Sequence, residues 1–405
     1  MELLNQPFNG QFGNRLIELL DSPDYQTLNI IVAFAKNSGV LRIKGALEKF
    51  RKRGGTVNVY VGVDLGGTSY EALTALLLHT DKLYVVHAEQ GQTFHSKIYQ
   101  FVGKEKGLVA VGSHNLTAGG LWTNFENSVL IPVGGLNEDK TELENGVGKY
   151  LSALDSLGDS LMPIEVQDDL DKLLENGYIV KEVAEQVRRA NAAMKKEGQT
   201  RLFGNGTAAK LPRVDTLKGV PAPSMPPSPI DIPNSDERLT IWFETRAMTG
   251  GSRNILDLSK KALVERGDPR GTPFDLGSPP FMRGGVEFFG LNPASIDATK
   301  NISVNYEGVD YKDNTILFPV GAKANGTWRL QIKGATQFGE NITEALNARS
   351  AGYYLPHKIV TFTKIQGDYY FMSVFPDSEL ANFKAASSIL ARNGPTKGAR
   401  FLGLI

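Results

Sequence analysis

The stretch that decides the fold of the N-terminal half of this chain spans residues 94–126. It reads FHSKIYQF at 94–101 and, after a short gap, VAVGSHNLTAGGLWTNFE at 109–126. The first segment follows the two-residue period of a β-strand, in which neighbouring side chains point to opposite faces. We therefore expect His95 and Lys97 to lie on one face of a strand.

A second strand is predicted at the apolar residues 108–111, and it stops at a Gly-Ser turn. If this strand pairs with the first one, the side chains of Ser113 and Asn115 lie beside His95. A lone carboxylate, Glu126, completes the stretch.

These side chains suit an attack on a phosphodiester. A neutral imidazole such as that of His95 is a nucleophile near neutral pH. Phosphoryl transfer spreads negative charge over the non-bridging oxygens, so its catalysis depends on positioning and charge stabilisation. Lys97 supplies a positive charge, and the Asn115 amide and the Ser113 hydroxyl supply neutral donors. A carboxylate such as Glu126 can hold the other ring nitrogen and set the tautomer.

The order H-x-K, then G-S-x-N, then a glutamate closely resembles the HKD motif of the phospholipase D superfamily. The fuller pattern, H-S-K-x-Y followed by G-S-x-N-L-T-x-G-G-L-x-x-N-x-E, is similar to the nuclease branch found in BfiI- and NgoFVII-type restriction endonucleases. By this resemblance His95 is the catalytic histidine and Lys97 the catalytic lysine. Ser113 and Asn115 then bind the phosphate, and Glu126 orients the histidine.

One position departs from the wider superfamily, which carries an aspartate shortly after the lysine where this chain has Val102. The restriction-nuclease branch also lacks that aspartate, so the difference favours a resemblance to this branch of the superfamily. A single H-x-K is common by chance, and a strand histidine bound to a carboxylate is ordinary structure. The complete ordered set is far less common, which favours the catalytic interpretation.

The number of H-x-K motifs leads to a mechanistic expectation. The chemistry needs a nucleophile on one side of the phosphorus and an acid for the leaving oxygen on the other. The sequence contains no second H-x-K, since His357 and Lys358 are adjacent. We therefore expect a homodimer in which two copies of His95 share one site and form a phosphohistidine. Paired Lys97 and Asn115 take the place of a metal ion.

The composition bounds the remaining possibilities. A chain of 405 residues is expected to form two or three domains. Its 44 basic and 44 acidic residues balance, so a nucleic-acid-binding surface has to come from local clustering. The lack of cysteine excludes disulfides and thiolate metal sites, and the five histidines form no visible metal cluster. No apolar signal or long uncharged apolar run occurs, which favours a soluble, cytoplasmic protein.

Residues 1–200 are expected to form a phospholipase D-like α/β domain, with a mixed sheet between helices. Strands are predicted at 28–35, 57–63, 83–87 and 128–133, and helices at 16–20, 40–53 and 70–78. Helical periodicity over 136–157 and 164–195 closes this domain or bridges to the next one. Trp122 is compatible with a place beside the substrate groove or with packing inside its own loop.

A change of composition marks a linker at residues 201–235, where seven prolines gather among Gly, Ser and Ala. Residues 236–405 then form a β-rich domain whose many short strands favour a small barrel or sandwich. Strands are predicted at 239–243, 286–289, 302–306, 316–320, 328–332, 359–362 and 369–374, and helices at 256–264 and 378–391.

The restriction enzymes that this chain resembles carry a B3-like pseudobarrel in the C-terminal half, which grips the major groove of DNA with two arms. By position, the first arm corresponds to residues 246–254 and the second to residues 321–326. Arginine and asparagine are the side chains that read guanine and adenine edges, although glycine-rich polar loops with an arginine are also ordinary loops. The candidates for contact with DNA are Arg246, Arg253, Asn254, Lys323 and Asn325.

The sequence thus favours a type II-like restriction endonuclease that hydrolyses double-stranded DNA without a metal ion or cofactor. A nuclease subunit that works with a separate ATPase or translocase, and with a methyltransferase, stays open. No Walker-type GxxxxGK[ST] occurs in this chain, so any ATPase is another chain. A lipid phosphodiesterase uses the same motif, but the separate β-rich domain and the lack of a membrane segment weigh against it. The intact motif weighs against a non-catalytic DNA-binding protein.

Overall fold

The computed structural model describes residues 1–134, 138–194, 204, 206–207, 209–214, 239–248, 253–321, 326–350 and 352–405. By its internal contacts the chain divides into two compact units. The N-terminal unit comprises Met1–Glu182 with Asn205–Asp215, and the C-terminal unit comprises Val183–Gly204 with Thr216–Ile405. The motif stretch belongs to the first unit and the β-rich half to the second.

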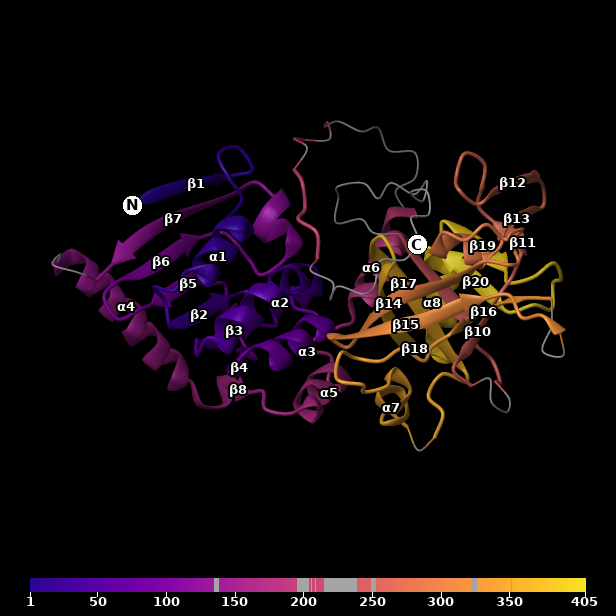
Figure 1. The fold of residues 1–405 in the computed structure, drawn as a ribbon. Helices are drawn as coiled ribbons and strands as arrows, with labels where there is room; N and C mark the ends of the chain where they lie inside the picture. The colour runs from indigo at the N-terminus through magenta and orange to yellow at the C-terminus, as the bar shows by residue number, and fades with distance from the viewer. Residues whose placement is uncertain are drawn as a thin grey trace. The chain divides into compact units, whose positions relative to one another are not determined.

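An eight-stranded mixed sheet forms the centre of the N-terminal unit, in the order β1-β7-β6-β5-β2-β3-β4-β8 (Figure 1). Its strands are β1 (Glu2–Gln6), β2 (Thr27–Val32), β3 (Thr56–Gly62), β4 (Lys82–Val86), β5 (Lys97–Val102), β6 (Gly107–Gly112), β7 (Glu126–Val133) and β8 (Leu161–Pro163). Strands β2, β3 and β4 run parallel, and the other neighbouring pairs are antiparallel. The mixed α/β sheet predicted from the sequence is therefore present.

Helices cover both faces of this sheet. They are α1 (Phe12–Asp21), α2 (Asn37–Lys52), α3 (Tyr70–His79), α4 (Glu138–Asp155) and α5 (Gln167–Glu175). Neighbouring residues of β2 show the separation, because Ile30 packs in a core with α1, α2, α3 and α5. Ile31 packs on the other face with Val147 and Leu154 of α4. The continuous apolar run of β2 is thus explained by burial on both faces.

One edge of the sheet carries the ends of β2, β3, β4 and β6 and the starts of β5 and β7. Gly62 at the end of β3 pairs with Val86 at the end of β4. Val32 at the end of β2 pairs with Lys97 at the start of β5. The end of β6 and the start of β7 lie at the same edge, since β6 continues the antiparallel order. In open α/β sheets, ligands bind outside the carboxyl ends of the parallel strands.

A second sheet of twelve strands forms the C-terminal unit, in the order β10-β16-β15-β14-β18-β17-β9-β20-β19-β11-β13-β12. The strands are β9 (Thr240–Glu244), β10 (Ile255–Leu258), β11 (Lys261–Arg266), β12 (Asp275–Ser278), β13 (Phe281–Arg283), β14 (Thr299–Tyr306), β15 (Val309–Leu317), β16 (Trp328–Gln331), β17 (Lys358–Gln366), β18 (Tyr369–Pro376), β19 (Ile389–Arg392) and β20 (Phe401–Leu404). In the described residues no ladder joins β10 to β12, so this sheet is β-rich without forming a closed barrel.

Three element predictions in the C-terminal unit need correction. The helix predicted at 256–264 is wrong, because these residues form β10 and most of β11, which pair with β16 and β19. The strand predicted at 286–289 is a short 3-10 helix, Gly285–Phe289. The helix predicted at 378–391 is shorter than expected, since α8 (Leu380–Ala386) ends before β19. A further helix, α7 (Ile342–Asn347), lies in the loop before β17.

Helix α6 (Glu182–Met194) packs in the C-terminal unit. Its residues Val183 and Val187 lie in an apolar cluster with Trp242 of β9 and Phe383 of α8. Gln186 of the same helix accepts a hydrogen bond of 2.9 Å from the hydroxyl of Thr240, at the start of β9. The helical stretch predicted at 164–195 is therefore two helices, and the second of them is part of the core of the C-terminal unit.

Most of the expected linker at 201–235 lies outside the described residues. Residues 209–214 are described, and they lie against the N-terminal unit. The backbone oxygen of Lys210 accepts from Gln11 at 2.8 Å, and that of Pro212 accepts from Arg42 at 3.1 Å. This part of the proline-rich stretch therefore belongs to the first unit.

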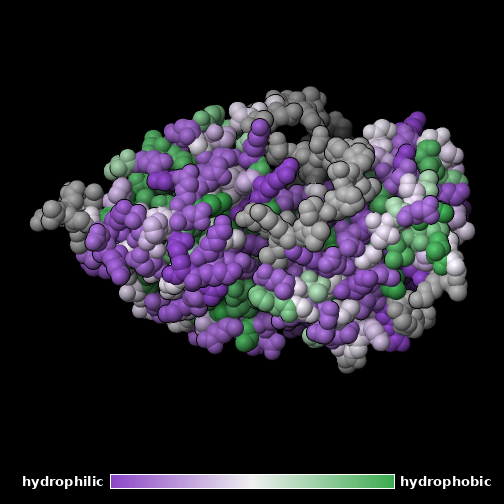
Figure 2. Space-filling model, viewed as in Figure 1, coloured by the Kyte–Doolittle hydropathy of each residue, from purple (hydrophilic) through white to green (hydrophobic). Residues whose placement is uncertain are grey.

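The surface offers few apolar areas on the side shown in Figure 2, where hydrophobic residues form small separate patches among hydrophilic ones. Among the described residues, none of the helices combines the length and the apolar character that crossing a bilayer requires.

A buried carboxyl group, that of Glu71 on α3, lies inside the N-terminal unit. Its side chain is 1% exposed, and its Oε2 accepts the backbone N–H of Glu182 at 3.0 Å. Burial, followed by the nearby negative charge of Glu182, raises the pKa of Glu71 to about 7. The carboxyl group therefore keeps its proton in the folded unit at mildly acidic pH.

We expect the free energy of unfolding to carry a pH dependence that comes from Glu71. The contribution of this group is fully present below its ordinary pKa of 4.5 and is lost as pH rises through about 7, because only the folded state holds the proton. Glu71→Gln is neutral at every pH and keeps an acceptor oxygen, so its stability relative to the wild type should rise across this range. Urea unfolding of both proteins at a series of pH values measures the difference, and parallel curves would contradict it.

Candidate phosphodiesterase site

The five side chains of the sequence motif are carried by neighbouring strands at the sheet edge described above. His95 lies two residues before β5, and Lys97 is the first residue of that strand. Ser113 and Asn115 follow β6, and Glu126 is the first residue of β7. The pairing of the two motif strands is confirmed, since Ile98 faces Val111 and Gln100 faces Val109. The prediction that His95 itself belongs to the strand is wrong.

His95 and Lys97 contact each other directly. Nδ1 of the His95 ring lies 2.7 Å from Nζ of Lys97, and the same ammonium donates to the His95 backbone oxygen at 2.9 Å. A lysine ammonium can only donate, so Nδ1 accepts and the neutral ring carries its proton on Nε2. Phe34 packs edge-on against the ring, with the centroids 5.7 Å apart. His95 is exposed, whereas Lys97 is buried.

The charge on Lys97 depends on two opposing effects. Burial lowers the pKa of Lys97 below its usual range, and the negative charge of Glu126 acts in the opposite direction. Glu126 also acts electrostatically on Tyr99, whose pKa is raised chiefly by burial. A buried cation of this kind interacts more strongly with an incoming anion than a fully hydrated one does.

Asn115 is held by the backbone of the segment that follows β2. Its Oδ1 accepts the backbone N–H of Phe34 at 3.1 Å. The next residue, Leu116, donates its N–H to the Phe34 oxygen at 3.0 Å and accepts from Lys36 at 3.0 Å. Because the amide oxygen is occupied in this way, the part of the Asn115 side chain left for an anion is its Nδ2 donor.

Glu126 binds neighbours other than His95. One of its oxygens accepts from the Ser113 hydroxyl, and the other accepts from Nδ2 of Asn124 at 3.2 Å. In the described residues of one chain these hydrogen bonds tie Glu126 to its neighbours in the motif loop, and its role in orienting His95 stays a prediction. In the sheet β6 lies between β7, which carries Glu126, and β5.

Asp64 and His87 are two site residues that the sequence analysis missed. Asp64 follows β3, and His87 follows β4. One oxygen of Asp64 lies 2.8 Å from Nδ1 of His87, and the other accepts the backbone N–H of Phe94 at 2.9 Å, so Asp64 fixes the segment just before His95. Polar residues directly after parallel strands were the available signal. Within the described residues, no three His, Cys, Asp or Glu side chains lie close enough together to hold a metal ion.

The other distinctive side chains of the motif loop are structural. His114 is buried, stacks on Phe12 with centroids 4.4 Å apart, and contacts the Ser128 hydroxyl through Nε2 at 3.0 Å. Burial lowers the pKa of His114. Trp122 is fully buried and donates to Asn14 at 3.0 Å, so it packs inside the unit instead of flanking a groove.

Three of the five candidate DNA-contacting residues lie in the described part of the C-terminal unit. Arg246 is exposed and pairs with Glu244 at 2.8 Å. The guanidinium of Arg253 lies 3.8 Å from the ring centroid of Tyr353. Asn254 precedes β10, and its buried Oδ1 has no hydrogen-bond partner among the described residues. The remaining candidates, Lys323 and Asn325, lie outside the described residues.

The two expected arms adjoin opposite ends of one strand pair in the sequence. In the antiparallel pair of β10 and β16, Ile255 faces Gln331 and Leu258 faces Trp328. The first arm, at 246–254, therefore ends beside the carboxyl end of β16. The second arm, at 321–326, comes just before the amino end of β16.

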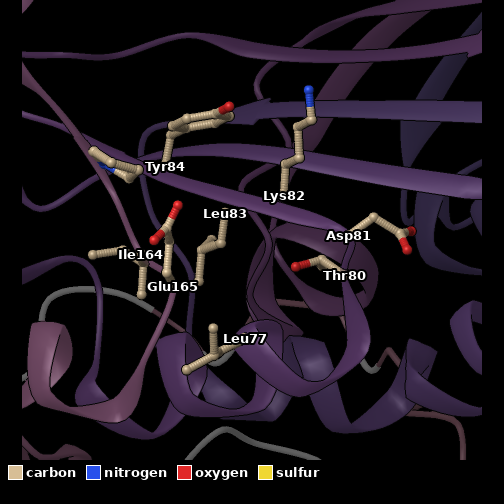
Figure 3. Close-up of a pocket in the computed structure, with 9 residues that line it drawn as sticks. Leu77, Thr80, Asp81, Lys82, Leu83, Tyr84, Ile164 and Glu165 are labelled. Carbon is tan, nitrogen blue, oxygen red and sulfur yellow. The ribbon is translucent and has the colours of Figure 1, made fainter.

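The pocket in Figure 3 is separate from the motif residues. It measures about 300 Å³ and lies beside the amino end of β4, lined by Leu77 of α3, residues 80–84 and residues 163–165. The motif residues lie at the edge where β4 ends. The pocket therefore belongs to the opposite edge of the sheet.

Comparisons with known proteins give structural likenesses only. No family model and no curated protein matches the chain. NucT from Helicobacter pylori is 18% identical over 40% of this chain and 98% of its own, with a TM-score of 0.28. The phospholipase D family member Nuc from Salmonella typhimurium is 17% identical over 41% of this chain and 97% of its own, with a TM-score of 0.30. Phosphatidylserine synthase from Haemophilus influenzae Rd KW20 is 11% identical over 48% of this chain and 47% of its own, with a TM-score of 0.33. Likenesses at this level do not show a family.

Proposed function

We propose that the N-terminal unit hydrolyses phosphodiester bonds through His95, and that the chain acts as a restriction-type endonuclease on double-stranded DNA. The observation that carries this proposal is the contact of 2.7 Å between an exposed imidazole, His95, and a buried cation, Lys97. Asn115 comes just after the neighbouring strand β6, and its side-chain amide is held by a hydrogen bond from the Phe34 backbone. An exposed nucleophile beside a desolvated cation and a fixed neutral donor suits an anionic, tetrahedral substrate.

In the proposed reaction a ring nitrogen of His95 attacks the phosphorus, and the bond from phosphorus to the leaving oxygen breaks. The attacking nitrogen must carry no proton. In the free protein the Lys97 ammonium donates a hydrogen bond to Nδ1. This hydrogen bond has to break when the phosphate binds Lys97, so that the ring presents an unprotonated nitrogen to the phosphorus. The phosphohistidine is then hydrolysed by water, which releases the imidazole.

A second copy of His95, from another chain, supplies the acid in this proposal. It protonates the leaving 3′ or 5′ oxygen and then takes a proton from the attacking water. The sequence has one H-x-K motif per chain, and two copies related by a twofold axis bring two imidazoles to one phosphate. The β-rich C-terminal unit, proposed to be a B3-like pseudobarrel, binds the DNA.

We expect the purified chain to cut a sequenced plasmid in the presence of EDTA, because its own cation and amide stabilise the transition state. Sequencing of the ends measures site specificity, and recurring ends at one sequence are expected. Loss of cleavage under chelation that Mg²⁺ restores would contradict the metal-independent reaction. Phosphatidylcholine in the same buffer is the comparison substrate, and its faster hydrolysis would contradict the assignment to DNA.

A further inference from the structure

Three loops at one end of the C-terminal unit carry cations and no carboxylate. In the sequence they span residues 245–254 after β9, residues 348–358 up to the first residue of β17, and residues 392–400 from the last residue of β19 to β20. The structure describes them except for residues 249–252 and 351. None of the three contains Asp or Glu, although acidic and basic residues balance over the whole chain. Their cations are Arg246, Arg253, Arg349, Lys358, Arg392, Lys397 and Arg400, of which Arg246, Arg349 and Arg392 form ion pairs with Glu244, Glu307 and Glu265. Such a local excess attracts a polyanion even when the net charge is zero.

Hydrogen bonds join these loops into one surface. Arg246 donates from Nη1 to the Gly398 oxygen at 3.0 Å, and Arg400 donates to the Ala247 oxygen at 3.2 Å. The backbone N–H of His357 donates to the Arg246 oxygen at 3.2 Å. The loops meet because β17, β9 and β20 are neighbours in the sheet.

The acidic residue nearest in sequence to these loops does not face the surface. Glu244, the last residue of β9, is 8% exposed. Its two oxygens accept from Nε of Arg246 at 2.8 Å and from the backbone N–H of Phe401 at 2.7 Å. The buried carboxylate therefore ties the loop after β9 to the start of β20, and it pairs with the charge of Arg246.

An aromatic–cation pair lies on the same loops. The guanidinium of Arg253 lies 3.8 Å from the ring centroid of Tyr353, which is 50% exposed. Stacking on a ring fixes the plane of a guanidinium and leaves its N–H edge free for two parallel hydrogen bonds. Lys358 of the neighbouring strand lies over the ring of Tyr354, with Nζ 5.6 Å from the centroid. A planar donor among spaced point charges suits a base edge flanked by phosphates.

We propose that the C-terminal unit binds double-stranded DNA on this surface, which consists of Arg246, Arg253, Tyr353, Lys358, Lys397 and Arg400. The inference rests on the proposed function for the choice of DNA. It adds the loops at 348–358 and 392–400 to the single arm that the sequence predicted there. Lys358 and Lys397 contact phosphates, and Arg253, held by Tyr353, reaches a base edge.

The test is a salt titration of DNA binding by the full chain in a His95→Ala background, which keeps the DNA uncut. A fluorescent DNA duplex is the probe, and it carries the cleaved sequence if the cleavage assay has identified one. Lys358→Gln with Lys397→Gln should weaken binding by about tenfold or more and lower the slope of log K against log salt by about 2. Tyr353→Leu should weaken binding several-fold with little change in slope, because it removes a stacking partner and no charge.

Arg188→Gln is the matched control, since it removes one exposed cation from the same unit. Arg188 lies on α6, which contacts the start of β9, whereas the proposed surface lies beyond the end of β9. This variant should bind as the parent does. Thermal unfolding of each variant confirms that it is folded.

Unchanged affinity and slope in the double lysine variant would overturn the surface, and so would an equal loss in Arg188→Gln. Competition by polyglutamate as strong as that by duplex DNA would instead assign the surface to an acidic protein. The proposed function fails in a different assay. If the chain with His95 intact cuts no DNA while the variants shift binding as expected, the surface stands and the nuclease assignment falls.

Discussion

Replacing His95 by alanine is expected to reduce plasmid cleavage by at least about a thousandfold, the largest effect of any single change in the N-terminal unit. Because two chains share one site, the substitution removes both imidazoles. One of them is the nucleophile, and the other is the acid for the leaving oxygen. The exposed ring makes few packing contacts beyond its edge-on approach to Phe34, so the fold should survive. Initial cleavage rates and duplex binding are the measurements, and only the first should change.

His79→Gln provides the matched control for that experiment. His79 belongs to the same unit, but it ends α3 and lies 3.5 Å from Glu48, at the sheet edge opposite the motif. Its variant should cut at close to the wild-type rate. If His95→Ala still cuts well, the nucleophile lies elsewhere, and His87, held by Asp64, is the next histidine to replace.

Sharing of the site between two chains has its own readout in the same variant. After subunit exchange, an equal mixture of wild-type and His95→Ala chains should show roughly one quarter of the activity of the same total amount of wild-type protein. Only the pairs of two wild-type chains have both imidazoles. Retention of half of the activity would show that each chain works alone.

Asn115→Asp is expected to lower the cleavage rate by about a hundredfold to a thousandfold, the size of effect seen when a donor to a developing anion is lost. The aspartate keeps an oxygen where Asn115 Oδ1 accepts from the Phe34 backbone at 3.1 Å, so the local fold is preserved. The Nδ2 donor becomes a negatively charged oxygen that repels the phosphate. Steady-state cleavage kinetics and thermal unfolding separate the two effects.

Asn14→Asp is the comparison for that variant. Asn14 is exposed on α1 and also uses its Oδ1 as an acceptor, from Trp122 at 3.0 Å. The substitution therefore adds the same charge to the same unit at a residue that contacts Trp122 of the motif loop and is not one of the five candidate site residues, and activity should persist. Equal activity of Asn115→Asp and the wild type would remove Asn115 from the phosphate site.

Local sequence patterns predicted the N-terminal elements well, because each depends on short-range periodicity. The run at 28–35 became β2, buried on both faces, and the helix predicted at 40–53 became α2. The partner of Glu126 could not be predicted in the same way, since it depends on the order of β5, β6 and β7. Asp64 and His87 come from strands other than those of the motif and meet its loop only in the folded sheet.

The C-terminal half was harder to read, because pairing outweighed local preference there. Apolar residues at helical spacing over 256–264 became β10 and β11, which are stabilised by ladders to β16 and β19. The aromatic run at 286–289 became a 3-10 helix whose rings pack inside the core. Such ladders join residues distant in sequence, so no local window contains the information.

The sequence alone determined the α/β character of the first unit, the β-rich character of the second, and the residues of the motif, since period and spacing are written along the chain. Only the tertiary structure decided that Lys97 caps the imidazole, that Glu126 binds Ser113, and that three basic loops meet at the end of β9. Those contacts join different strands or depend on the orientation of a buried side chain. Strand pairing and side-chain orientation are both set by the packing of the whole sheet.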